Sequence, residues 1–452
     1  MNSTRDLTKG SSFKAIIAFA IPLFFSNLFQ QLYNSIDSLI VGNMLGTNAL
    51  AAVSSSGNIM FFFNSFFIGT SMGAGVLVSK TFGAKDYNAM KKAIHTNIAL
   101  GIIMGIALTL IGYFGAPVIL RIMKTDPLVL PQSIMYFKCY FLGALGFVMY
   151  NIFNGILNAL GNSKRSLVYL IISSTLNIFL DLLFVGVFKF GVGSAAIATA
   201  ISQLTSAILA FLFLIRKGTF YQVKISEIKI DRFNLLLILK YGLPSGIQNS
   251  VISLSNMFIQ SNINTFGNNA MAGCGTYSKV EGFAFLPVNC FTMALSTFVS
   301  QNLGAKEYER AKKGSRFGIL AGVILAEFVG ALMFLFMPYI AKLFSDDPEV
   351  IRFASLQAKV DCLFYFLMAF SHCVAAILRG AGKAFVPMII MLSVWCVFRV
   401  IYVYFALKMN PNIETLFTAY PVTWTISSLI YFIYYNFTKW EYSFEKKYNK
   451  SA

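Results

Sequence analysis

The amino-acid sequence predicts an all-α polytopic membrane protein, with twelve transmembrane helices in two six-helix bundles related by a parallel internal repeat. Three observations support this fold class. The 452 residues are 57% hydrophobic and only 12% charged, whereas soluble domains are about half apolar and about a quarter charged. Twelve apolar segments are long enough to cross a bilayer, and a motif of the first half recurs in the second. This composition excludes a water-soluble enzyme, a fibrous protein and a disordered chain.

The expected spans follow from length and hydropathy, because a membrane-crossing helix needs about 20 mostly apolar residues. They lie near residues 15–42, 51–79, 93–119, 132–160, 166–188, 192–215, 235–265, 273–301, 316–341, 353–379, 384–407 and 414–438. Short connectors join them, and none is long enough for a separate soluble domain. We therefore expect an N-terminal bundle over residues 1–215, a cytoplasmic linker over 216–233 and a C-terminal bundle over 234–452.

The distribution of basic residues orients these spans. The net charge is +18, from 36 Lys and Arg against 18 Asp and Glu. If both termini are cytoplasmic, 26 of the 36 basic residues lie in cytoplasmic segments and 6 in external loops. Such a bias is typical of multi-pass membrane proteins. Because the charge is spread over seven short segments, it indicates orientation in a lipid bilayer, and we expect no nucleic-acid partner.

The internal repeat relates the two halves of the chain. Residues 78–92 match residues 299–313 at eight of fifteen positions, at an offset of 221, and the same offset pairs Gly46 with Gly267. Each half contains six spans, so both halves begin on the same side of the membrane. The arrangement resembles transporters in which two parallel halves rock about a substrate site at their interface. Transport is favoured over an oligomeric channel, because a duplicated monomer already supplies a central cleft, and we expect a monomer.

Polar residues recur at steps of three and four along several spans of the first half, which places them on one helix face. An ionised carboxylate inside the bilayer is costly unless it is paired, hydrated or bound to a cation. Two carboxylates among amide and hydroxyl oxygens form a hard site that suits Na⁺ or H⁺, and repulsion between close carboxylates favours uptake of a proton. The alternative is ordinary hydrogen bonding between helices, with both acids at a water boundary. The residues in question are Asn27, Gln30, Asn34, Asp37, Asn151, Asn154, Asn158, Ser173, Asn177, Asp181, Thr199 and Ser202.

The second half keeps the polar stripe but not the acid pair. The seventh span contains Asn256 and Gln260, yet the position equivalent to Asp37 is Phe258 or Ile259. The partner of Asp181 in the repeat is Tyr402. We therefore expect the ion site to belong to the first half.

The second half has intramembrane charges of its own. Glu281 lies in the run VEGFAFLP, beside aromatic residues and a proline, which suits a lipophilic cation through charge pairing and cation–π contact. Pairing with Lys279 at the membrane edge, or simple exposure to water, is the alternative. Asp361 and Arg399 are expected to form a structural ion pair.

Several of these features together resemble the MATE (multidrug and toxic compound extrusion) family of transporters. They are Pro22, the run NSIDSLIVGNMLG from Asn34 to Gly46, the two Gly-Ala-Lys-(Asp/Glu)-Tyr loops and the run VEGFAFLP. The resemblance covers essentially the whole chain and is strongest to the bacterial MepA-like group, near the DinF-like branch. It implies a V-shaped pair of bundles in the bacterial cell (inner, plasma) membrane, with both termini cytoplasmic. It also implies export of cationic amphiphilic compounds in exchange for Na⁺ or H⁺.

The resemblance also implies roles for particular residues. In the branch whose cation site lies in the first half, the ligands fall here on Asp37, Asn154, Asn177, Asp181 and Thr199. Expected substrate contacts are Gln30, Tyr33, Asn34, Phe153, Asn256, Gln260 and Glu281. The NorM-like branch also uses acids on helices 7 and 10. Helix 7 here has no acid, although Asp361 leaves part of that second site open.

Two other functions are alternatives to antiport. A flippase for a lipid-linked saccharide, from the same wider superfamily, tends towards fourteen spans and an Arg-rich cavity, so twelve spans and intramembrane acids argue against it. The sequence has no H-E-x-x-H, G-x-S-x-G or clustered Cys and His residues. We therefore expect no enzymatic activity, no cofactor, and no metal other than Na⁺ at Asp37 and Asp181.

Overall fold

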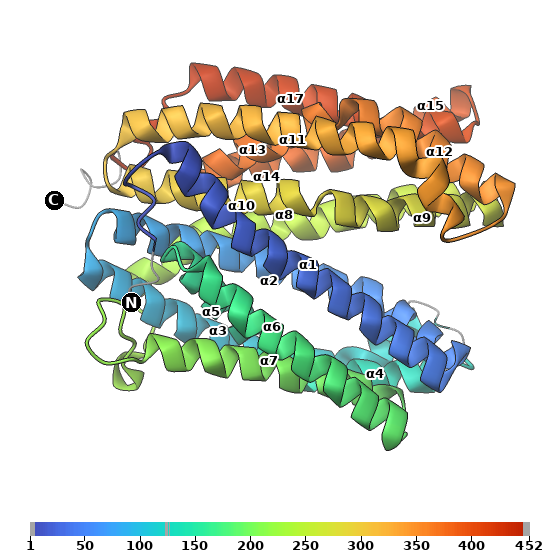
Figure 1. Cartoon of the computed structure of the whole chain (residues 1–452), viewed down its shortest axis with the longest axis horizontal. Coiled ribbons are helices and arrows are strands. Elements are labelled where there is room, and N and C mark those ends of the chain that lie inside the picture. The colour runs from blue at the N-terminus through green and yellow to red at the C-terminus, as the bar shows by residue number, and fades with distance from the viewer. Residues whose placement is uncertain (1–4, 123–124, 126, 446–452) are drawn as a thin grey trace. The chain divides into compact units, whose positions relative to one another are not determined.

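The structure is a computed structural model that describes residues 5–122, 125 and 127–445, and all regular secondary structure in these residues is helical (Figure 1). The first half contains α1 (Ser12–Leu45), α2 (Thr47–Gly83), α3 (Tyr87–Ile122), α4 (Leu130–Leu142), α5 (Ala144–Ala159), α6 (Ser163–Asp181), the π-helix η1 (Leu182–Val187) and α7 (Val192–Leu214). A short 3₁₀ turn, η2 (Ile225–Glu227), lies in the segment between the halves.

The second half repeats this series with more breaks. It contains α8 (Arg232–Asn264), α9 (Asn268–Ala284), α10 (Leu286–Gly304), α11 (Tyr308–Lys342), α12 (Pro348–Asp361), η3 (Cys362–Phe364), α13 (Tyr365–Gly380), α14 (Phe385–Met391), the π-helix η4 (Leu392–Phe398), α15 (Arg399–Met409), α16 (Ile413–Phe417), α17 (Ala419–Phe437) and η5 (Trp440–Tyr442).

These helices account for the twelve predicted spans once directly consecutive pieces are counted together. Eight segments of the described chain are long and apolar enough to cross a membrane, and the bent pairs α4–α5 (47°) and α9–α10 (42°) raise the number to ten. The other two are α2 and α8, whose 37 and 33 residues are also long enough to cross a bilayer. The chain is thus a multi-pass membrane protein, as the sequence predicts.

The described residues form two compact units. The first consists of Phe25–Gly242 with Arg5 and Asp6, and the second of Leu7–Phe24 with Leu243 onwards. The unit boundaries therefore cut through α1 and α8, a few residues from Pro22 and Pro244. The predicted bundle boundaries follow the internal repeat rather than these contacts, and they stay a prediction.

The repeat is visible in the backbone as well as in the sequence. Left-handed φ angles recur at the same places in the two halves, 221 residues apart. The pairs are Gly46 (86°) and Gly267 (98°), Lys85 (57°) and Lys306 (60°), and Gly161 (75°) and Gly382 (72°). Few non-glycine residues adopt such angles, so the lysine pair in particular shows that both halves preserve one turn geometry.

Close helix packing in the second unit depends on small residues of α11. Gly314, Gly318, Gly322, Ala326 and Gly330 recur every four residues and are buried. A Cβ atom at Gly318 would lie 2.6 Å from Leu295 Cδ1, and one at Gly330 would lie 2.6 Å from the Cys362 carbonyl oxygen. Small residues at this spacing let membrane helices approach closely. The opposite face of α11 exposes Leu320, Ile324, Phe328, Leu335 and Phe336.

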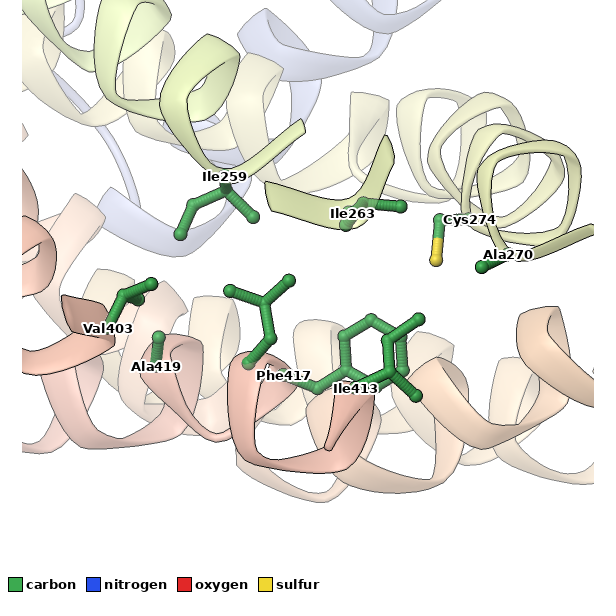
Figure 2. Packing of buried hydrophobic residues seen from close by; sticks show 9 residues of the cluster. Ile259, Ile263, Ala270, Cys274, Val403, Ile413, Phe417 and Ala419 are labelled. Atoms are coloured by element: carbon green, nitrogen blue, oxygen red, sulfur yellow. The ribbon is translucent and has the colours of Figure 1, made fainter. Parts of the chain in front are cut away.

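A hydrophobic cluster joins the ends of several helices in the second unit (Figure 2). Ile259 and Ile263 of α8 lie opposite Phe417 of α16, and Cys274 of α9 closes one side. These side chains are at most 3% exposed. The cluster stabilises the packing of the end of α8 against α9 and α16.

Candidate functional site

The two acids of the first unit lie on different helices. Asp37 is on α1, and Asp181 is the last residue of α6, directly before the π-helix η1. Such π-helical turns often occur at functional sites. Asn177 precedes Asp181 by one helical turn, so its side chain and the Asp181 carboxyl group lie on the same face of α6.

The carboxyl groups of Asp37 and Asp181 interact directly with each other. Asp181 is completely buried. Among the described residues, no donor reaches Asp37 Oδ1 or either carboxyl oxygen of Asp181. Burying a charge without a partner is very costly, so the charge of this pair is poorly compensated within the described residues.

Amide and hydroxyl groups of α6 and α7 flank this pair, and the two helices lie side by side in the first unit (Figure 1). Asn177 is 1% exposed, and its Nδ2 donates to Thr199 Oγ1 at 3.4 Å. Asn177 Oδ1 receives no hydrogen bond from the described residues. One turn further from the acids, Ser173 Oγ donates to the Ser202 carbonyl oxygen at 2.7 Å and joins the same two helices. The acid pair therefore has a buried amide oxygen beside it.

Two tyrosine hydroxyls complete the surroundings of the acids. Tyr33 is hydrogen-bonded to Gln30 and to Gln203, and it lies within electrostatic range of both carboxyl groups. Tyr136 of α4, which is 6% exposed, also lies within range of both acids. Tyr136 and Gln203 are not among the residues that the sequence singles out. In a chain with 46 Phe and 21 Tyr residues, a single tyrosine carries little signal.

Three other predicted residues of the first half lie elsewhere. Asn154 Oδ1 accepts hydrogen bonds from Asn158 Nδ2 (3.1 Å) and from Ser166 Oγ, and Ser166 precedes Asn177 by about 16 Å of helix rise. Phe153 is buried, with its ring 5.6 Å from that of Phe211. The Asn34 side chain is exposed. The structure thus groups Asp37, Asp181, Asn177 and Thr199, but not Asn154. The roles of Asn154, Phe153 and Asn34 stay predictions.

Glu281 of α9 has hydroxyl partners in the second unit. Tyr365 and Tyr277 donate to Glu281 Oε1 at 3.1 and 3.4 Å, and the two hydroxyl oxygens are 2.8 Å apart. The ring of Phe285 packs against Tyr365 at 5.0 Å. Lys279 is exposed. Glu281 is therefore a half-buried carboxyl group beside aromatic rings, and its contact with a substrate stays a prediction.

Asp361 and Arg399, both described by the structure, do not form the expected ion pair, so that expectation is wrong. Asp361 instead accepts a hydrogen bond from Gln357 Nε2 at 3.3 Å. Arg399 Nη1 donates to Asn256 Oδ1 at 3.3 Å and Nη2 to Thr423 Oγ1 at 3.2 Å. The guanidinium group is drawn to these two oxygens on α8 and α17 instead. The other polar residue predicted on this helix, Gln260, donates to Asn264 Oδ1 at 3.0 Å, one turn further along α8.

A duplicated set of membrane-spanning helices, with an acid pair on two helices of the first unit, is typical of a membrane transporter, and comparison with known proteins agrees. The MatE family model matches residues 22–183 and again residues 244–405. The chain belongs to the MATE family of transporters.

Individual relatives cover nearly the whole chain. The chain is 29% identical over 444 residues to the probable multidrug resistance protein YoeA of Bacillus subtilis, covering 96% of each protein. It is 22% identical to the multidrug export protein MepA of Staphylococcus saprophyticus, covering 83% of each. A MATE multidrug transporter solved in an outward-facing conformation has a TM-score of 0.89 at 22% identity, with 96% of this chain and 97% of that chain covered. A MOP superfamily transporter from Pyrococcus furiosus has a TM-score of 0.90 at 21% identity, with 98% and 99% covered.

Proposed function

We propose that this transporter is a cation-coupled antiporter that exports cationic amphiphilic compounds by alternating access, with H⁺ or Na⁺ as the coupling ion. In this proposal it works as a monomer in the bacterial cell membrane, with both termini in the cytoplasm and no cofactor. The names of the relatives, a multidrug export protein among them, support the substrate class.

The observation that carries the proposal is the contact between Asp37 and Asp181. Two carboxyl groups in direct contact repel each other when both are ionised. Because Asp37 Oδ1 and both Asp181 carboxyl oxygens have no donor among the described residues, binding of one proton or one Na⁺ would stabilise the pair strongly. A coupling ion needs such a site, since it can shift a conformational equilibrium only by the difference in its affinity for the two states.

The neighbouring residues fit either ion. The Asn177 amide oxygen and the carboxyl oxygens are hard ligands of the kind that alkali cations prefer. With a proton instead, one carboxyl group would donate to the other, and the Tyr33 and Tyr136 hydroxyls would adjust around the shared proton. Both outcomes place the coupling step in the first unit.

Dye efflux from proteoliposomes tests the proposal. Vesicles containing the full chain are loaded with a cationic fluorescent dye, and either a Na⁺ gradient or a pH gradient is imposed. We expect Asp37→Asn and Asp181→Asn each to lower gradient-driven efflux at least tenfold, because each removes one carboxylate of the pair.

The matched control is Asp346→Asn, which neutralises an exposed acid in the loop between α11 and α12. It should transport like the wild type. Full coupled efflux in both variants of the acid pair would refute the proposal. The gradient that drives wild-type efflux identifies the coupling ion.

A further inference from the structure

Arg399 lies, in the internal repeat, near the position that Asn177 occupies in the first half. The two family matches run over residues 22–183 and 244–405, so the second begins and ends 222 residues after the first. At this offset Arg399 is the counterpart of Asn177, and at the offset of 221 given by Gly161 and Gly382 it is the counterpart of Ile178, so Arg399 lies within one residue of the Asn177 position. The counterpart of Asp37 is Phe258 or Ile259 and that of Asp181 is Tyr402 or Val403, at offsets of 221 and 222, and none of these side chains is an acid. The second unit thus has a fixed cation in the region where the first unit has two acids.

The contacts of Arg399 parallel those of Asn177. Asn177 donates to the hydroxyl of Thr199 on α7, and Arg399 donates to the hydroxyl of Thr423 on α17. The helices α7 and α17 are the sixth spans of their halves. Arg399 also donates to Asn256, the counterpart of Asn34 on the first span. The guanidinium group on the fifth span of the second half is therefore bonded to the first span, α8, and to the sixth, α17.

Aromatic rings hold this guanidinium group in place. Its central carbon is 5.4 Å from the centre of the Trp395 ring and 4.9 Å from that of Tyr420. Arg399 is only 1% exposed. Cation–π contacts strengthen when the cation is removed from water, and an arginine side chain does not release its proton in a protein. The positive charge at this position is therefore permanent and immobile.

The acids of the second unit face this charge without forming an ion pair. Arg399 interacts electrostatically with both Asp361 and Glu281. Each acid has its own hydrogen-bond donors, Gln357 for Asp361 and two tyrosines for Glu281. One permanent cation thus offsets part of the negative charge of two acids, as a bound ion would.

We propose that Arg399 is a tethered cation that takes, in the second unit, the place that the exchangeable coupling ion takes in the first. The second unit then binds no coupling ion of its own, and one site in the first unit sets the ion stoichiometry. Arg399 is a positioning residue here, because it acts through Asp361 and Glu281. The inference rests on the proposed function, which places the coupling ion at the first-unit acids.

Counting bound cations in a variant that lacks the first-unit site tests this inference. The full chain carrying Asp37→Asn and Asp181→Asn is purified into lipid nanodiscs. Bound ²²Na⁺ is measured at equilibrium, and retained protons are measured by titration and by the infrared absorption of protonated carboxyl groups. We expect Arg399→Gln, added to this background, to bind about one more cation per chain, either Na⁺ or H⁺. Arg399→Lys, which retains the charge, should bind no additional cation.

Two results would overturn the inference. One is a folded Arg399→Gln variant that gains no cation. The other is a background variant that already binds an exchangeable cation and loses it when Glu281→Gln or Asp361→Asn is added. Both concern the number of cations on the second unit, whereas the proposed function fails if the first-unit variants retain coupled efflux. The two failures are therefore distinguishable.

A loss of folding would also be informative. Arg399→Met, of similar length and without charge, is the second variant. If Arg399→Gln and Arg399→Met are both destabilised, adding Glu281→Gln to either should raise its Tm, because it removes one of the uncompensated acids. A double variant no more stable than the single one would contradict a charge-balancing role.

Discussion

The Asn177 side chain on α6 donates to the Thr199 hydroxyl on α7, with 3.4 Å between Nδ2 and Oγ1, one turn before Asp181. This bond orients the Asn177 amide so that Oδ1, which receives no bond from the described residues, is available as a ligand. The pair thus links the packing of α6 on α7 to the chemistry of the acid pair.

Replacing Thr199 by Val should weaken binding of the coupling ion. The substitution conserves shape but removes the acceptor for Asn177, at a cost of about 1 kcal/mol, or roughly fivefold in affinity. Dye efflux measured against Na⁺ concentration or pH gives the half-saturation point. Thr205→Val is the matched control, because Thr205 on the same helix is partly exposed and donates to the Ile201 carbonyl oxygen of its own helix. Equal half-saturation in the two variants would contradict the role of Thr199.

Replacing Glu281 by Gln should change substrate preference. The amide still accepts from Tyr277 and Tyr365, so the local fold is expected to persist, but charge pairing with a cationic substrate is lost. We expect efflux of monovalent cationic dyes to fall roughly tenfold, with a smaller effect on neutral substrates. Glu327→Gln is the control, since this half-buried acid on α11 accepts from the Phe366 amide. Equal losses for both kinds of substrate would argue against charge pairing at Glu281.

Replacing Gly330 by Ala should destabilise the second unit. The added methyl group would meet the Cys362 carbonyl oxygen at 2.6 Å, and overpacking of this kind costs about 1–3 kcal/mol. Gly275→Ala on α9 is the matched control, because a Cβ there has no neighbour within 4 Å and alanine favours the helix by up to about 1 kcal/mol. Thermal unfolding in detergent should give a lower Tm for the first variant only. A Tm for Gly330→Ala at or above that of the control would mean that α11 can move away.

Replacing His95 by Ala should release the segment between the two halves. His95 Nε2 accepts from the Lys224 amide at 3.0 Å, and next to it Thr96 Oγ1 accepts from the Asp231 amide at 3.2 Å. Loss of one such bond costs about 1 kcal/mol, which corresponds to a roughly fivefold increase in local opening. Chymotrypsin cleavage after Phe220 and Tyr221 should speed up accordingly. Lys92→Ala, on the exposed face of the same helix, should leave the cleavage rate unchanged.

The helices and their order could be predicted from the sequence because lipid leaves a membrane chain little choice. Backbone groups in hydrocarbon must be hydrogen-bonded within the chain, so each long apolar stretch becomes a helix. Polar spacing also identified Asp37, Asp181, Asn177 and Thr199. It did not distinguish them from Asn154, whose periodicity is the same and whose partner is Ser166.

By itself, then, the sequence determined the twelve spans, the duplication and the polar residues that recur along one helix face, because hydropathy, repeats and spacing are local properties of the chain. The tertiary structure decided which of these residues meet, since that depends on how each helix is rotated and shifted against its neighbours. It brought Tyr136 and Gln203 to the surroundings of the acid pair. The tertiary structure also places Asn256 Oδ1 and Thr423 Oγ1 within hydrogen-bonding distance of the Arg399 guanidinium group. Arg399 therefore bonds to these two oxygens and does not form an ion pair with Asp361.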